Sequence, residues 1–194
     1  MEIVCFDFLI LLLEIILASK LGAKVFLISG PTNEKLSDLS IDLTLITSSD
    51  EMYEKVIAKY SKCDVVIMSA AVADFKPKII SSNKIKKSKQ TISIEVENTK
   101  DILSYLGEHK NNQLLIGFAL ETENEIENAK LKLKNKNLDL IVLNSLNDEG
   151  AGFGVDTNKI TIISKGNKSI NFPLKDKKSV SLDIVNNIIE LINE

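Results

Sequence analysis

Six lysines and one aspartate lie close together in the middle of this 194-residue sequence. The aspartate is Asp74, which follows an apolar run and the small residues of 69–73, and the lysines are Lys76, Lys78, Lys84, Lys86, Lys87 and Lys89. No carboxylate lies among these lysines, although the whole chain carries a net charge of -3. Ammonium groups beside a carboxylate that can hold a divalent cation suit a polyphosphate, so the cluster favours nucleotide triphosphate chemistry. The alternative is a solvated, lysine-rich surface loop.

The composition is that of an ordinary globular protein, with 44% hydrophobic and 26% charged residues. The length fits one domain with a full hydrophobic core. A pI near 5.4 indicates no bulk attraction to nucleic acid or to an anionic membrane. Only 5% of the residues are aromatic and none is Trp, which argues against a base-stacking surface. We therefore expect a single domain over residues 1–194, with no nucleic-acid partner and no membrane partner.

The two cysteines and the single histidine limit other chemistries. Cys5 and Cys63 form no C-x-x-C pair, so a reducing, cytoplasmic location is expected. His109 lies in a polar run and is expected to be an exposed loop residue. One histidine excludes a multi-histidine metal site and argues against a serine triad.

The N-terminal segment contains a short apolar run over residues 8–13, bracketed by Asp7 and Glu14 and preceded by no Lys or Arg. A signal peptide begins with basic residues and a membrane span is longer, so neither fits this run. The apolar spacing instead predicts a core helix over residues 9–20.

Strands and helices alternate through most of the chain. Buried strands are predicted over residues 24–29, 41–46, 64–69, 114–119 and 138–143, and a half-exposed strand over residues 91–96. Capping boxes at Ser48 with Glu51 and at Thr122 with Glu125 each predict a helix start, a short helix follows residues 98–103, and a last helix covers 180–191. Residues 159–163 and 169–172 predict a hairpin. This order indicates an α/β fold: a doubly wound, mostly parallel sheet with a C-terminal β-hairpin.

The common phosphate-binding motifs are missing. The sequence contains no G-x-x-x-x-G-K-[ST], and the glycine-rich stretch 150–154 is followed by a strand where a dinucleotide fingerprint requires a helix. This pattern disfavours a nicotinamide-dependent oxidoreductase. A nucleotide site would therefore be built from strand ends and scattered lysines.

Five segments, taken in order, resemble one family. They are AAVADF at 70–75, KIKK at 84–87, GFALET at 117–122, KNLDLIVLN at 136–144, and GFG with DTN at 152–158. Together they resemble phosphopantothenate–cysteine ligase, the C-terminal half of the bifunctional bacterial coenzyme A biosynthesis protein. The resemblance runs from about residue 17 to the C-terminus.

The resemblance implies a Rossmann-like ligase fold and a two-step reaction in coenzyme A biosynthesis. CTP and 4'-phosphopantothenate give an acyl-cytidylate with loss of pyrophosphate, and the cysteine amine then displaces CMP to give phosphopantothenoylcysteine. Lysines and Mg2+ are the expected stabilisers of the charge that develops on the phosphates. The family also implies a homodimer. It further implies a flavin-dependent decarboxylase, either as a domain or as a separate chain, and FMN is expected only in that decarboxylase.

The resemblance also assigns residues. Asp74 would hold the nucleotide through a divalent cation, and Lys84 would contact the reacting phosphate and carboxylate. The remaining nucleotide contacts would come from Ala70, Lys100, Asp101, Ile102, Leu103, Phe118, Lys132 and Lys136. Phe118 would lie against the cytosine, Lys132 and Lys136 would bind triphosphate oxygens, and residues 100–103 would use their backbone. Without the resemblance, Phe118 reads as a core aromatic and the lysines as solvated surface.

Residues 1–16 depart from the family pattern, because they contain no glycine and no asparagine. We therefore expect the first strand and the glycine-rich loop of the family not to be recognisable here. The alternative to an active ligase is a truncated, non-catalytic nucleotide-binding or dimerisation remnant of that ligase.

Overall fold

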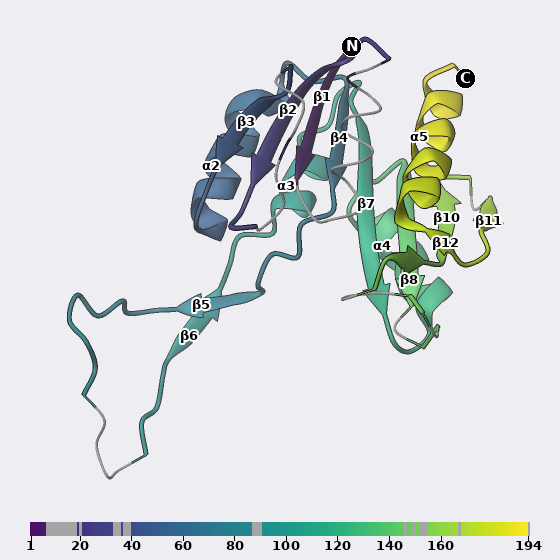
Figure 1. Ribbon diagram of the computed structural model, residues 1–194. Helices are drawn as coiled ribbons and strands as arrows, with labels where there is room; N and C mark the ends of the chain where they lie inside the picture. Colours follow the sequence, from purple (N-terminus) through teal and green to yellow (C-terminus); the bar gives the residue numbers. More distant parts are fainter. Residues whose placement is uncertain are drawn as a thin grey trace.

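The computed structural model describes residues 1–6, 19, 21–32, 36, 40–86, 91–145, 147–148, 150–151, 155–166 and 168–193. These residues form an eight-stranded sheet in the order β11-β10-β8-β7-β4-β1-β2-β3 (Figure 1). The strands are β1 (Glu2–Phe6), β2 (Lys24–Ser29), β3 (Asp42–Leu45), β4 (Val65–Met68), β7 (Leu114–Glu121), β8 (Leu140–Ser145), β10 (Ile160–Ser164) and β11 (Ser169–Asn171). Strands β8 to β3 are parallel, whereas β10 and β11 form an antiparallel hairpin. The predicted α/β fold is confirmed.

Strand β1 occupies the centre of the sheet, between β4 and β2. No strand was predicted at this position, because the first strand of the family was not recognisable in residues 1–16; the structure nevertheless places a strand there. Ile3 is buried in register with Val25 on one side and Val65 on the other. The helix predicted over residues 9–20 and the glycine-rich stretch 152–154 lie outside the described residues, Ser19 excepted.

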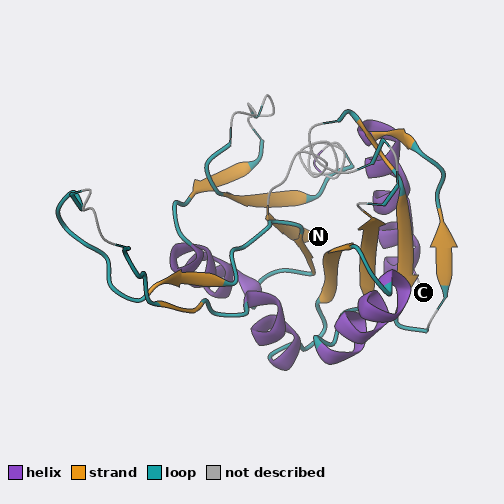
Figure 2. Ribbon diagram, turned by 90° about the horizontal axis from the view of Figure 1, so that it is seen from below, coloured by secondary structure: helices purple, strands orange, loops and turns teal. Residues whose placement is uncertain are grey.

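Helices cover both faces of the sheet, as Figures 1 and 2 show. One face is covered by α2 (Ser49–Tyr60), α3 (Ile102–Glu108) and α4 (Glu125–Asn135), and the other by α5 (Lys177–Asn193). Val56, Leu106 and Leu133 belong to one buried cluster, whereas Ile184 belongs to the second cluster across the sheet. Two cores separated by a sheet are what a doubly wound fold requires.

The two predicted capping boxes have different outcomes. At α2 the prediction is confirmed: Ser48 accepts from the Glu51 N–H, and Glu51 accepts from the Ser48 N–H at 3.2 Å. At α4 it is wrong, because the N-cap is Asn124, in the left-handed region at φ 46° and without a side-chain cap. Glu125 instead accepts hydrogen bonds from Ser145 and Asn147, so tertiary contacts replace the local cap.

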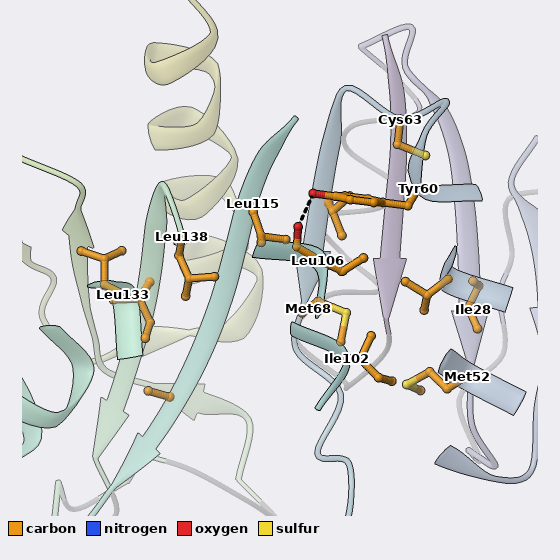
Figure 3. Close-up of a cluster of buried hydrophobic side chains, with 14 of the residues drawn as sticks. Ile28, Met52, Tyr60, Cys63, Met68, Ile102, Leu106, Leu115, Leu133 and Leu138 are labelled. Carbon is orange, nitrogen blue, oxygen red and sulfur yellow. Dashed lines mark hydrogen bonds between the residues drawn. The ribbon is translucent and has the colours of Figure 1, made fainter. Parts of the chain in front are cut away.

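The core beneath α2 and α3 includes one buried polar contact (Figure 3). Tyr60 donates its hydroxyl to the carbonyl oxygen of Leu106 at 2.7 Å, which joins the end of α2 to α3. Cys63 is buried nearby as a free cysteine. His109 is exposed at the C-cap of α3, as predicted.

A two-stranded arm projects from the sheet between β4 and α3 (Figures 1 and 2). It begins with β5 (Phe75–Pro77) and returns through β6 (Val96–Asn98), and the two strands pair antiparallel. The half-exposed strand predicted over residues 91–96 is therefore wrong in extent, because only Val96 of that range is in a strand. A two-residue ladder of β9 (Thr157–Asn158) and β12 (Lys175–Asp176) completes the fold.

Candidate functional site

A cavity of about 620 Å³ opens at the carboxyl ends of β2, β3 and β4. Its walls are the loops 29–32, 46–49 and 70–73, the base of the arm at 75–77, and Thr99. Small side chains after β4, among them Ala70, leave this space open. Hydroxyl groups of Ser and Thr and the ammonium of Lys76 give it polar walls. Parallel sheets bind ligands at the carboxyl ends of their strands, at the topological switch point where successive connections begin to run to opposite sides of the sheet. Here that point lies at β1, between β2 and β4.

Asp74 lies at the rim of the cavity, between the lining residues Ala73 and Phe75. Two hydrogen bonds fix this loop, because Thr99 donates its N–H to Asp74 O at 2.9 Å and its hydroxyl to Ala73 O at 2.7 Å. The Asp74 residue is exposed, and within the described ranges its carboxylate makes no hydrogen bond or ion pair. It therefore stays available to a cation.

The base of the arm is tied to the start of α2 through Asp50. Lys76 pairs with Asp50 at 2.5 Å and with Glu97 at 3.7 Å, and Lys100 approaches Asp50 at 3.9 Å. The hydrogen bond from Lys76 lowers the pKa of Asp50, and the same bond raises the pKa of Lys76. Lys100 also lies over the Tyr53 ring, 4.4 Å from its centroid. Lys76 and Lys100 are thus held beside the cavity by carboxylates and an aromatic ring.

The N-terminus of α3 is joined to the end of α4 by Lys136. Asp101 caps α3 by accepting from the Ser104 N–H at 2.9 Å, and the Lys136 ammonium lies 3.0 Å from the same carboxylate. Desolvation raises the pKa of Asp101, but the hydrogen bonds from Ser104 and Lys136 outweigh it, so the pKa is lowered. Ile102 is buried and Leu103 packs on the core at the first turn of α3.

One turn earlier on α4, Lys132 pairs with Glu121 at the end of β7. The ammonium lies 2.5 Å from a Glu121 oxygen, and the Glu121 side chain is only 13% exposed. Phe118, on the same strand, is half-buried and packs against the cluster on the α5 face of the sheet. Lys132 and Phe118 therefore start from opposite faces of β7.

The structure groups the predicted site residues unevenly. Ala70, Asp74 and Lys100 adjoin the cavity, and Asp101 meets Lys136 beyond it, with the segment 99–103 joining the two groups. Lys84 lies in the part of the arm between β5 and β6, and it is not among the residues that line the cavity of the same chain. None of this tests the predicted contacts with CTP, which remain predictions.

Sequence reasoning missed two carboxylates of this region, Asp50 and Glu121. Asp50 lies in the first turn of the helix that the Ser48 capping box predicted, and Glu121 belongs to the GFALET segment, so both residues lie in segments that the sequence had already singled out. What the sequence did not provide was their partners, because Lys76 and Lys132 reach them only in the folded chain.

Two classes of feature are not found in the part of the chain that the structure describes. No three His, Cys, Asp or Glu residues gather where they could hold a metal ion. No described helix has both the length and the apolar composition to cross a bilayer. A Mg2+ site at Asp74 would therefore need oxygens from the substrate phosphates, which is how Mg2+ is commonly held.

Comparisons with known proteins give the family. The profile described as "DNA/pantothenate metabolism flavoprotein C-terminal domain" matches residues 16–192. A protein named cysteine/cysteine sulfinic acid decarboxylase, from an unknown prokaryotic organism, is 48% identical over 177 residues, which are 91% of this chain and 49% of that protein. The coenzyme A biosynthesis bifunctional protein CoaBC of Bacillus subtilis (strain 168) is 42% identical over 174 residues, which are 90% of this chain and 43% of that protein.

A solved structure matches over the whole chain. The crystal structure of the C-terminal domain of the coenzyme A biosynthesis bifunctional protein CoaBC has a TM-score of 0.81 at 34% identity. The match covers 100% of this chain and 96% of that domain, β1 included. The chain spans about half the length of the curated relatives it matches. It belongs to the family of DNA/pantothenate metabolism flavoprotein C-terminal domains.

Proposed function

We propose that this chain is a phosphopantothenate–cysteine ligase, which uses CTP to join 4'-phosphopantothenate to cysteine in coenzyme A biosynthesis. The observation that carries the proposal is the match with the solved CoaBC C-terminal domain over the full chain, at 34% identity. Membership of the family over residues 16–192 supports it, as do relatives named for coenzyme A biosynthesis. A cavity at the carboxyl edge of the sheet, lined by apolar side chains with several hydroxyl groups and the Lys76 ammonium, provides room for the substrates.

The reaction needs two displacements. A carboxylate oxygen of 4'-phosphopantothenate attacks the α-phosphorus of CTP, and pyrophosphate leaves with the bonding electron pair. The cysteine amine then attacks the acyl carbon and loses a proton, and the carbon–oxygen bond to CMP breaks. Because both steps move negative charge along phosphate oxygens, fixed ammonium groups and backbone N–H donors are the appropriate catalytic groups.

Lys132 and Lys136 bind the triphosphate in this proposal. Each already pairs with a carboxylate, Glu121 or Asp101, but an ammonium has three N–H donors, so pairing leaves donors for phosphate. The carboxylates also fix the direction of two otherwise mobile side chains before the nucleotide arrives. Lys100 and the backbone of residues 101–103 add contacts from the start of α3, and Phe118 lies against the cytosine.

Asp74 fits a divalent cation, because its carboxylate is exposed at the cavity rim and unpaired within the described residues. Mg2+ held there would neutralise phosphate charge and orient the triphosphate. Asp74 itself would bind the cation, and the hydrogen bonds from Thr99 would keep its loop in place.

The arm carries a homodimer in this proposal. Ile79 is 78% and Ile80 87% exposed, and several more apolar residues along the arm are open to solvent, which is typical of an interaction surface. A second copy that packs on this surface would let the arm bring Lys84 to the neighbouring cavity. Ile80→Glu should therefore shift the protein to monomers in light scattering, whereas Ile192→Glu on α5 should not. A wild-type monomer at all concentrations would overturn this part.

The wider setting follows from the relatives. Because those relatives include proteins named as bifunctional, we place the ligase beside a decarboxylase domain or chain. FMN would belong to that decarboxylase and not to the residues assigned here. The reaction would take place in the cytoplasm, where free thiols such as Cys63 are maintained.

The proposed function is tested by incubating the protein with CTP, Mg2+ and 4'-phosphopantothenate. Release of pyrophosphate that requires all three components supports it, and cysteine should then yield CMP. Thermal stabilisation by CTP without pyrophosphate release would support the non-catalytic nucleotide-binding remnant instead. If CTP gives no thermal stabilisation and no pyrophosphate is released, both the ligase and the nucleotide-binding remnant are contradicted.

A further inference from the structure

Gly107, near the end of α3, makes a backbone contact with the end of α4. A Cβ at this buried glycine would lie 2.0 Å from the carbonyl oxygen of Lys136 and 2.8 Å from its carbonyl carbon. Real Cβ atoms do not approach other heavy atoms to less than 3.0 Å, and the obstacle is backbone that cannot swing away. The φ of Gly107 lies outside the left-handed region, so the requirement is for space alone.

Lys136 contacts α3 at two separate places. Its backbone carbonyl lies against Gly107, and its ammonium donates to Asp101 at 3.1 Å. Asp101 and Gly107 are about 9 Å apart along α3, at a rise of ~1.5 Å per residue. The distance between the two helices at Gly107 therefore decides whether the ammonium reaches the start of α3.

Asn137 holds this contact closed. Its side-chain N–H donates to Gly107 O at 2.9 Å, from a backbone in the left-handed region at φ 49°. Lys110 donates to Asn137 O at 3.0 Å, and Lys165 donates to its side-chain oxygen at 3.3 Å. The residue after Lys136 is thus fixed to α3 and to two lysines.

We infer that Gly107 is a positioning residue of the nucleotide site, which acts by setting the place of the Lys136 ammonium. The inference rests on the proposed function, because it takes Lys136 as a triphosphate ligand. A methyl group at Gly107 must displace the Lys136 carbonyl by at least 1.0 Å to reach 3.0 Å. Because the carbonyl belongs to the same residue, the backbone end of the Lys136 side chain would move with it, and the contact of the ammonium with Asp101, now 3.0 Å, would have to re-form in another geometry. A misplacement of about 1 Å in a group that positions the substrate can lower the reaction rate on the order of 100-fold.

The test is a double-mutant cycle of Gly107→Ala with Lys136→Ala, read out as the Kd for CTP by titration calorimetry. Gly107→Ala alone should raise that Kd by about tenfold to 100-fold, which is what the loss of one hydrogen bond to a charged group costs, and should leave the KM for cysteine unchanged. In the Lys136→Ala background the same substitution should change the Kd by less than about twofold, since the ammonium it positions is gone. Gly166→Ala is the matched control, because nothing lies within 4 Å of a Cβ there.

Additive effects of the two substitutions, or a Kd for Gly107→Ala within about twofold of wild type, would overturn the inference. If Gly107→Ala does not fold, Asn137→Gly decides in its place: glycine tolerates the left-handed backbone but loses the bond to Gly107 O. It should raise the Kd for CTP only when Lys136 is present. If the wild type binds no CTP, the proposed function fails as well; if it binds CTP and the cycle is additive, this inference alone fails.

Discussion

The Lys110–Asp139 ion pair gives a stability prediction whose size can be worked from the structure. The two side chains are only 8% and 15% exposed, and Lys110 donates to both carboxylate oxygens at 2.8 and 2.7 Å. In Lys110→Met the bond from the Leu115 N–H, at 2.7 Å, is the one that the Asp139 carboxylate keeps among the described residues. Breaking a buried pair costs about 3–5 kcal/mol. We expect about 3 kcal/mol here, because that bond and some exposure remain.

This loss is measured by urea unfolding at pH 7, and it corresponds to a fall in Tm of about 6–12 °C for a chain of this size. The matched control is Lys78→Met, which breaks an exposed pair with Glu95 (51% and 66% exposed) and should cost about 0–1 kcal/mol. Adding Asp139→Asn to Lys110→Met should recover part of the loss, because a neutral amide still accepts from Leu115. If Lys110→Met, like the control Lys78→Met, loses less than about 1 kcal/mol, the reasoning on burial is wrong.

Three further predictions concern single side chains. Tyr60→Phe leaves Leu106 O without its donor and should cost about 1–2 kcal/mol in urea unfolding. Because burial raises the pKa of Tyr60 to about 12, the wild type should also lose stability above a pH of about 10, and this loss should be smaller in the variant, where the buried Cys63 thiol still contributes. Since Lys76 lowers the pKa of Asp50, this carboxylate stabilises the fold above the usual carboxyl pKa, so wild type and Asp50→Asn should differ in stability at pH 7 and converge as the pH falls through the lowered pKa and Asp50 becomes protonated. Lys132→Met should raise the KM for CTP about tenfold to 100-fold, whereas Lys134→Met, on another side of α4, should leave it unchanged.

Much of the fold could be predicted because buried parallel strands are continuous apolar runs, as 114–119 and 140–143 are. Strand β1 was missed because a short apolar run at the start of a chain does not distinguish strand from helix. Its partners are β2 and β4, and that pairing is a long-range property. The false capping box at Thr122 fails for a similar reason, because Glu125 is bound by Ser145 from β8.

The site could be predicted in residue types but not in pairings. Small residues after β4 and the exposed Asp74 lie where the strand pattern placed them, at the carboxyl edge. The lysines were expected either to contact phosphates or to be solvated, whereas Lys76, Lys132 and Lys136 each pair with a carboxylate. Those pairs join segments far apart in the chain, and no local spacing encodes them. Gly107 gave no sequence signal either, since its role depends on the backbone of α4.

The most direct test of the central claim follows one oxygen atom. 4'-Phosphopantothenate labelled with 18O in its carboxylate is incubated with the protein, CTP, Mg2+ and cysteine, and the 18O content of each product is measured by mass spectrometry. An acyl-cytidylate transfers one labelled oxygen to the phosphate of CMP, and the account predicts this result. Label in inorganic phosphate or pyrophosphate, or unlabelled CMP during turnover, would contradict it.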